Sequence, residues 1–166
     1  MSKAFALAGI RVGWIASRDP TIVEAVAAAR DYTAISVSQL DDQVAAYALS
    51  PAVKPALLER NLMLARRNLE LLAGFVEKYA SAVDWVRPTA GTTALLRFSK
   101  GGVPVEEDGF CRAVLDEVDV LFVPARRCFG RGEDFAGAVR VGYVCHEGVL
   151  KEALARLGTY VENHLL

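Results

Sequence analysis

A long amphipathic segment, covering residues 53–79, constrains the fold of this chain more than any other feature. Apolar side chains recur along it at spacings of three and four, and charged side chains occupy the other faces. This period predicts one long helix whose apolar stripe packs against a second layer of structure. The stripe consists of Leu58, Leu62, Ala65, Leu69, Leu72 and Val76.

The charges of this segment do not predict a nucleic-acid partner. Arg66 and Arg67 could contact phosphates, but a solvated helix face explains them without a partner. The whole chain has 19 basic and 20 acidic side chains, which gives a formal net charge of −1. Proteins that bind nucleic acid through bulk charge need a basic surface, so we expect no nucleic-acid binding.

Hydrophobic periodicity predicts alternating helices and strands along the rest of the chain, and therefore an α/β layered unit. Asp19 before Pro20, and Ser38 before Asp41, are typical of capped helix starts. The predicted strands cover residues 10–17, 83–86, 92–98, 118–123 and 138–144. The predicted helices cover residues 21–31, 36–49, 53–79, 108–116 and 147–164.

Composition indicates a folded protein with reduced thiols. The chain has 166 residues, 53% hydrophobic and 23% charged, which excludes intrinsic disorder. Its cysteines, Cys111, Cys128 and Cys145, are widely spaced and odd in number, so we expect no disulfide framework and a cytoplasmic location. Arg11 interrupts the apolar start, and no stretch has the length of a membrane span, so we expect no membrane association.

Residues 2–14 form the first candidate site, because a lysine precedes a small-residue loop and a strand that carries an arginine. Gly13 shares a strand face with Arg11 and leaves room beside its guanidinium, a group suited to phosphate. A lysine amine near apolar groups and another cation can lose its proton and attack a carbonyl carbon. The alternative for Lys3 is a frayed tail without chemistry.

Residues 138–143 form the second candidate site. Val139, Val141 and Tyr143 share one strand face, and Arg140 and Gly142 share the other. An arginine beside a glycine gap can clamp a carboxylate through charge-assisted hydrogen bonds. The alternative is a surface arginine on an edge strand.

Three other features predict local structure rather than chemistry. His146 follows Cys145 but has no further ligand at metal spacing, so we interpret it as a capping or surface histidine and expect no metal. Gly130 and Gly132 lack the third glycine of a dinucleotide motif and are typical of a turn. The acidic residues 106–108 predict a solvated helix start.

Four ordered motifs resemble class I/II aminotransferases, which are fold-type I enzymes that use pyridoxal phosphate. The first resembles the family's lysine segment, and the others resemble its small domain. In order, the motifs are Ser2-Lys3 with Phe5, Leu7, Gly9 and Ile10-Arg11-Val12-Gly13-Trp14; Pro88-Thr89-Ala90-Gly91 with Ala94-Leu95-Leu96; Val120-Leu121-Phe122-Val123-Pro124 with Phe129-Gly130; and Val139-Arg140-Val141-Gly142-Tyr143.

This resemblance implies a role for each candidate residue. Lys3 matches the lysine that holds pyridoxal 5'-phosphate as a Schiff base and then moves a proton at the substrate α-carbon. Arg11, with Ser2 beside the lysine, matches the residues that bind the cofactor phosphate. Arg140 matches the arginine that binds the substrate α-carboxylate. Ala8 stands where many family members have proline, which is a mild departure.

The resemblance also implies a fold and a reaction. Residues 1–50 match the end of the large cofactor-binding domain, 51–80 a connecting helix, and 81–166 a small α/β domain with a short mixed or antiparallel sheet. The implied reaction transfers an amino group between an α-amino acid and a 2-oxo acid, in a homodimer. Racemisation, β-elimination and cyclisation remain open, because the same lysine and arginines serve them.

The match starts at Ser2, whereas the family's phosphate loop, ring-stacking aromatic residue and ring-nitrogen aspartate all precede the lysine. We therefore expect this chain to hold part of a site and to bind the cofactor weakly or not at all by itself. A non-catalytic remnant or interaction module, and a split enzyme, are the alternatives. Arg126 and Arg127 are more basic than the family pattern and either contact an acidic substrate tail or lie on a loop surface.

Overall fold

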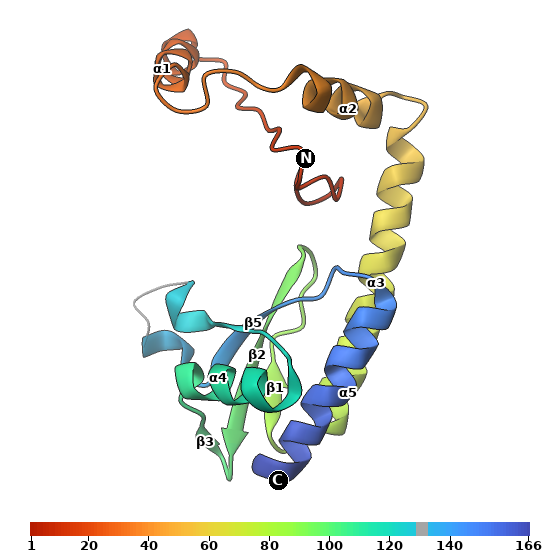
Figure 1. The fold of residues 1–166 in the computed structure, drawn as a ribbon, viewed down its shortest axis with the longest axis vertical. Coiled ribbons are helices and arrows are strands. Elements are labelled where there is room, and N and C mark those ends of the chain that lie inside the picture. The colour runs from red at the N-terminus through yellow and green to blue at the C-terminus, as the bar shows by residue number, and fades with distance from the viewer. Residues whose placement is uncertain (129–132) are drawn as a thin grey trace. The chain divides into compact units, whose positions relative to one another are not determined.

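The computed structural model describes residues 1–128 and 133–166, and its chain divides into two compact units. The first unit is Met1–Leu62 and the second is Met63–Leu166. The division falls inside helix α3, Lys54–Lys78, which is the long helix that the amphipathic segment predicts (Figure 1). The motif residues Phe129, Gly130 and Gly132 lie outside the described residues.

Two capped helices precede α3 in the first unit. Helix α1 is Pro20–Arg30, and the Asp19 carboxylate accepts the Thr21 N–H at 2.9 Å with Pro20 at the first position. Helix α2 is Gln39–Leu49, and the Ser38 hydroxyl accepts the Asp41 N–H at 3.4 Å. Both predicted caps are therefore confirmed, and each satisfies an N–H group that a helix start leaves free.

The predicted strand over residues 10–17 is wrong, because these residues form an irregular segment. A strand is stable only when a neighbour satisfies its backbone groups, and no described segment pairs with this one. Arg11 departs from extended geometry altogether, with φ of 52°. Alternating apolar side chains therefore remain uncovered here, as the 63% exposure of Trp14 shows.

The second unit contains a five-stranded sheet with the order β1-β2-β5-β4, in which β3 pairs with β2. Every pairing is antiparallel. Glycines at 101 and 102, with φ of 57° and 80°, make the predicted turn between β2 and β3. The strands are β1 Val83–Trp85, β2 Thr93–Lys100, β3 Val103–Pro104, β4 Val123–Pro124 and β5 Ala138–Gly142.

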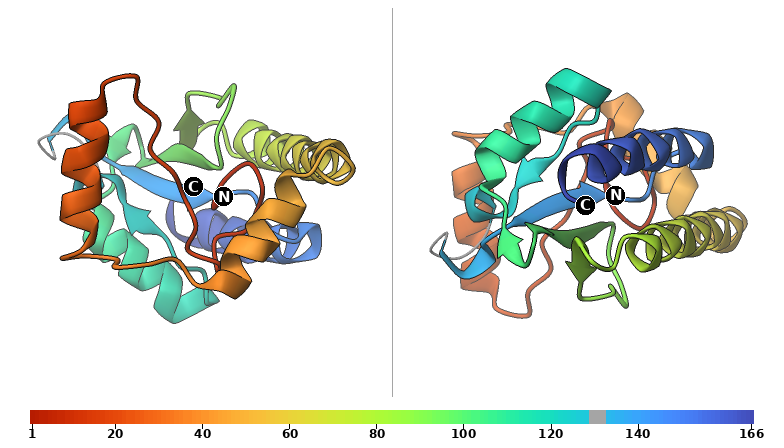
Figure 2. Two further views of the ribbon diagram at one scale, coloured as in Figure 1. Left: turned by 90° about the horizontal axis from the view of Figure 1, so that it is seen from above. Right: turned by 90° about the horizontal axis from the view of Figure 1, so that it is seen from below.

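Helices α3, α4 (Glu107–Val118) and α5 (Glu147–His164) pack on one face of this sheet, and α3 and α5 lie side by side (Figure 2). The stripe of α3 enters the core from Ala65 onward, whereas Leu62 is 54% exposed. The predicted two-layer α/β fold with a short antiparallel sheet is therefore confirmed. The fully buried side chains include Leu72, Leu96, Phe98, Val114, Val139, Leu157 and Val161.

The strand predicted over residues 118–123 is mostly wrong. Helix α4 extends to Val118, and Asp119 ends it in the left-handed conformation with φ of 57°. Val120 and Phe122 are buried in the core without strand pairing, which explains the apolar alternation that predicted a strand. Within this stretch only Val123 pairs with β5, and Pro124, which follows it, pairs with β5 as well.

Candidate functional site

The N-terminal segment presents the Lys3 side chain from a turn whose backbone is tied down. The Ala6 N–H donates to the Lys3 carbonyl at 2.9 Å, and the Asn61 amide of α3 donates to the Ala4 carbonyl at 2.9 Å. The Lys3 side chain is exposed and makes no hydrogen bond or ion pair within residues 1–128 and 133–166. Its amine is therefore available to a ligand, with Ser2 beside it.

Arg11 lies in the same unit as Lys3, at the end of the small-residue loop. Its guanidinium donates to the Ala8 carbonyl at 2.8 Å, and its backbone N–H donates to the same carbonyl at 3.4 Å. Most of the guanidinium donors stay free, since this is the one contact its side chain makes in the described chain. The space beside Gly13 is open: no described atom lies within 4 Å of a Cβ placed there.

Arg140 belongs to the second unit and lies in the middle of the sheet. Its strand β5 pairs with both β2 and β4, where its cross-strand partners are Leu95 and Val123. The edge-strand alternative is therefore wrong, although the predicted face assignment is confirmed. Val139, on the opposite face, is completely buried, while Arg140 is half-buried.

The face of the sheet that carries Arg140 is the one that the second unit's helices leave open. Its guanidinium makes no ion pair or hydrogen bond with the residues that the structure describes. Antiparallel register places Thr93, Leu95 and Arg97 on this same face. A half-buried arginine without an acid partner has its donors available to an added carboxylate.

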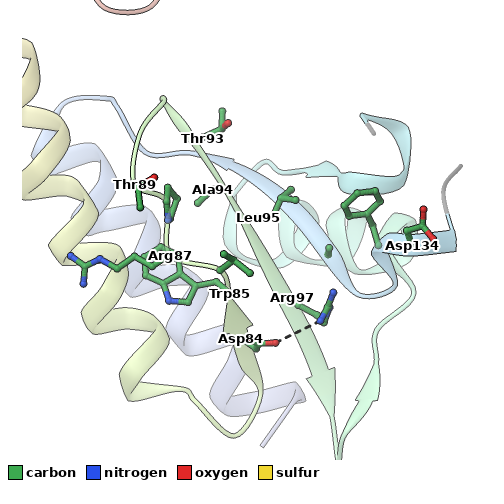
Figure 3. Close-up of a pocket in the computed structure, with 13 residues that line it drawn as sticks. Asp84, Trp85, Arg87, Thr89, Thr93, Ala94, Leu95, Arg97 and Asp134 are labelled. Atoms are coloured by element: carbon green, nitrogen blue, oxygen red, sulfur yellow. Dashed lines mark ion pairs between the residues drawn. The ribbon is translucent and has the colours of Figure 1, made fainter. Parts of the chain in front are cut away.

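A cavity of about 520 Å³ lies on this open face (Figure 3). Leu95, the cross-strand partner of Arg140, contributes to its wall, whereas Arg140 itself does not. The arginines around it already have acid partners, since Arg97 lies 3.7 Å from Asp84 and Arg87 lies 2.5 Å from Glu70. The remaining lining is mostly apolar or hydroxylic, including Trp85, Thr89, Thr93, Phe135 and Ala138.

The acidic residues 106–108 are not simply a solvated helix start. Glu107 is buried, and its carboxylate accepts the Gly137 N–H at 2.6 Å. Glu106 caps α4 by accepting the Gly109 N–H at 2.7 Å. The solvated interpretation holds for the exposed cap Glu106 and is wrong for Glu107, because a tertiary contact that the sequence does not display buries the Glu107 carboxylate.

Arg126 and Arg127 are taken up by this same acidic group. Arg126 pairs with Glu106 at 2.8 Å and also with Asp108, and Arg127 pairs with Asp108 at 2.9 Å. Hydrogen bonds from Arg126, and then from Arg127, hold the pKa of Asp108 below its ordinary value. Because both guanidinium groups are already paired, the structure does not support the interpretation that Arg126 and Arg127 contact an acidic substrate tail.

Asn68 of α3 is a buried polar residue that sequence reasoning missed. Its side-chain amide donates to the carbonyls of Tyr143 and Cys145, at 2.7 and 2.8 Å. Both acceptors follow β5 and therefore lie just after Arg140. The signal in the sequence is a neutral polar residue directly before Leu69 of the apolar stripe.

His146 is the N-cap of α5, where its ring nitrogen accepts the Gly148 N–H at 3.3 Å, so the capping interpretation is confirmed. Burial raises the pKa of the Cys111 thiol to about 11, which keeps it protonated and unreactive near neutrality. Across the described chain, no group of three or more metal-ligating side chains is assembled. Within those same residues, no helix has the length and apolar content needed to cross a bilayer.

Comparison with known proteins identifies one family. Its model, described as aminotransferase class I and II, matches residues 1–157. Capreomycidine synthase of Streptomyces vinaceus is 32% identical over 164 residues, which cover 99% of this chain and 39% of that protein.

Solved structures give the same result. A pyridoxal-phosphate-dependent aminotransferase from Streptococcus suis is 31% identical, with a TM-score of 0.83 over 98% of this chain and 40% of its own. The pyridoxal-phosphate-dependent cyclase OrfR is 27% identical, with a TM-score of 0.80 over 98% of this chain and 41% of its own. This chain thus spans about two fifths of the length of these relatives, and it belongs to the aminotransferase class I and II family.

Proposed function

We propose that this chain supplies the cofactor-holding lysine and two anion-binding arginines of a pyridoxal-phosphate-dependent aminotransferase. The observation that carries the proposal is the family match over residues 1–157, which includes Lys3, Arg11 and Arg140. The chain covers 39% of capreomycidine synthase and 40% of the Streptococcus suis enzyme. The proposed activity is therefore that of this chain together with the remainder of the fold.

The residues of the first unit fit pyridoxal phosphate chemically. Lys3 would hold the cofactor through its amine, which no described group occupies. Arg11 would bind the phosphate, because a guanidinium offers paired donors to phosphate oxygens and only one described contact uses it. Ser2 would add a hydroxyl donor beside the lysine.

Arg140 would bind the α-carboxylate of the amino acid or the 2-oxo acid. Its place in the central strand β5 limits movement of its Cα, so the guanidinium has a fixed base. The absence of an acid partner among the described residues means that no internal ion pair must break before substrate binds. Specificity for the carboxylate follows from the two parallel N–H donors of the guanidinium.

The cofactor, when bound, supplies the electron sink that makes the substrate α-carbon acidic. The remaining work belongs to the protein. The Lys3 amine, once the substrate amine has displaced it, is the base that would move a proton between the substrate α-carbon and the cofactor. Arg140 would hold the substrate by its carboxylate and so limit the orientations that the α-carbon can adopt.

Cyclisation is the second candidate reaction. The observation that favours it is similarity to capreomycidine synthase at 32% identity and to the cyclase OrfR at 27% identity. Cyclisation uses the same lysine and carboxylate-binding arginine, so Lys3 and Arg140 do not discriminate between the reactions. A non-catalytic module that retains the second unit is the remaining alternative.

An activity measurement separates these candidates. The chain is assayed with and without a polypeptide that supplies the remaining part of the fold, using an α-amino acid panel with 2-oxoglutarate as acceptor. Formation of glutamate, lost in Lys3→Ala and kept in the exposed control Lys54→Ala, supports amino transfer. Conversion of the amino acid to a cyclic product without glutamate supports cyclisation. No turnover in either mixture contradicts the catalytic proposal and favours a non-catalytic module.

A further inference from the structure

We propose that Asn68 is a positioning residue for Arg140, acting through the backbone at the end of β5; this inference rests on the proposed function of Arg140. Asn68 is completely buried in α3, on the face of the sheet opposite to Arg140. Its amide donates two hydrogen bonds, at 2.7 Å to the Tyr143 carbonyl and at 2.8 Å to the Cys145 carbonyl. The contact therefore fixes the strand end rather than the arginine side chain.

The chemistry of the side chain explains why an asparagine stands at this position. A carboxamide NH₂ has two donor hydrogens and no charge, so it can satisfy two buried carbonyls at once. The carbonyl oxygen of the same side chain, Asn68 Oδ1, is buried and has no hydrogen-bond partner among the described residues. An unpaired buried oxygen costs free energy, and the two hydrogen bonds that the amide gives to the strand end offset this cost.

A second set of contacts ties the same strand end to the two residues that precede β2. The Tyr143 hydroxyl donates to the Gly91 carbonyl at 2.8 Å, and the Tyr143 N–H donates to the Thr92 carbonyl at 3.2 Å. Tyr143 is 2% exposed, so its ring is packed as well as hydrogen-bonded. With Asn68 on the α3 side, the chain that follows Arg140 is held from two directions.

A displaced strand end would move the guanidinium relative to a bound carboxylate. A bidentate contact requires both N–H donors to face the carboxylate oxygens, so a displaced guanidinium binds a carboxylate less tightly. Asn68 therefore controls carboxylate affinity without touching the substrate. A residue that only adds stability would leave the affinity of the folded molecule unchanged.

The test uses the full chain together with a polypeptide that supplies the remaining fold, and it compares the wild type with four variants. Asn68→Leu removes both donors at nearly constant volume. Leu72→Ala, one helical turn later in the same core, lowers stability without contacting β5 carbonyls. Arg140→Lys removes the fork-shaped donor. The fourth variant, Asn163→Leu on an exposed face of α5, serves as a surface control. The urea midpoint and the dissociation constant for 2-oxoglutarate are measured for every variant. The Arg140 Nε–Hε resonance is recorded in every variant that retains Arg140.

We expect Asn68→Leu to shift the Arg140 resonance and to raise the dissociation constant by about tenfold, because the charge-assisted hydrogen bonds to the carboxylate would be misaligned. Leu72→Ala should lower the urea midpoint and leave both readouts unchanged. Equal effects of Asn68→Leu and Leu72→Ala, or an unshifted Arg140 resonance in Asn68→Leu, would overturn the positioning role. If the wild type does not bind 2-oxoglutarate, or if Arg140→Lys binds it equally well, the proposed role of Arg140 is wrong. In that case the Arg140 resonance alone decides whether Asn68 positions Arg140.

Discussion

The carboxylate of Glu107, at the start of α4, accepts a 2.6 Å hydrogen bond from the backbone N–H of Gly137, just before β5. Gly137 has φ of 73°, and a Cβ there would lie 2.6 Å from the Phe98 carbonyl oxygen. The chain therefore passes close to β2 at a point where only glycine fits without strain. One buried acid and one glycine together fix where the arginine-bearing strand begins.

Replacement of Glu107 tests this connection. Glu107→Ala leaves the Gly137 N–H without its acceptor and removes the partner 3.6 Å from Arg126, so we expect a loss of about 2 kcal/mol in the free energy of unfolding. Urea unfolding of the full chain measures it. Asp116→Ala, an exposed acid of the same helix with no described ion pair, should change stability by less than about 0.5 kcal/mol. Equal losses of unfolding free energy in Glu107→Ala and Asp116→Ala would show that the Glu107–Gly137 hydrogen bond does not stabilise the chain.

Two glycines of the paired helices α3 and α5 should respond in opposite directions to the same substitution. A Cβ on Gly158 would lie 2.5 Å from the Tyr79 hydroxyl, which also hydrogen-bonds Glu162 at 2.6 Å. We expect Gly158→Ala to destabilise the chain by about 1–3 kcal/mol through overpacking. Gly74, exposed in α3, has no atom within 4 Å of a Cβ.

Gly74→Ala should therefore raise the free energy of unfolding by up to about 1 kcal/mol, because alanine restricts the unfolded chain and favours helix. Thermal or urea unfolding of both variants checks the pair. A stabilised Gly158→Ala protein would mean that α3 and α5 are farther apart than the Tyr79 contact indicates.

Much of the secondary structure could be predicted because its signals are local. Asp19, Ser38 and His146 each cap a helix with contacts to residues two or three positions away, and the apolar period marks α3 and α5. Residues 10–17 alternate apolar and other side chains as a strand would, but no described segment pairs with them, so the predicted strand is absent. Pairing is a property of the whole chain, so alternation alone could not reveal its absence.

In the candidate site, too, local features could be predicted from the sequence, whereas contacts between distant residues could not. The strand face of Arg140 follows from a period of two, and the structure confirms it. The burial of Glu107 depends on Gly137, and the two bonds of Asn68 depend on Tyr143 and Cys145. Such contacts join residues that are distant in sequence, and only folded coordinates display them.

Alkaline pH should destabilise the chain through Cys111. Burial raises the pKa of this thiol from 9.0 to about 11 in the folded state, so folding favours the protonated form. This contribution to stability is fully present below pH 9.0 and is lost as the pH rises toward about 11. Urea unfolding across this pH window should show the decline.

Burial also raises the pKa of Tyr143 and Tyr160, which contribute in the same direction. The variant Cys111→Ala isolates the thiol, because it removes that titration and should make the decline shallower. An identical slope in Cys111→Ala would show that the thiol does not take part.

The most direct test of the central claim is covalent trapping of pyridoxal phosphate on Lys3. The chain is mixed with the cofactor, alone and with a polypeptide that supplies the remaining fold, then reduced with borohydride and mapped by mass spectrometry. We expect a phosphopyridoxyl group on Lys3 in the completed fold, present in Lys54→Ala and lost in Lys3→Ala. Labelling spread over exposed lysines, or none on Lys3 in either mixture, would contradict it.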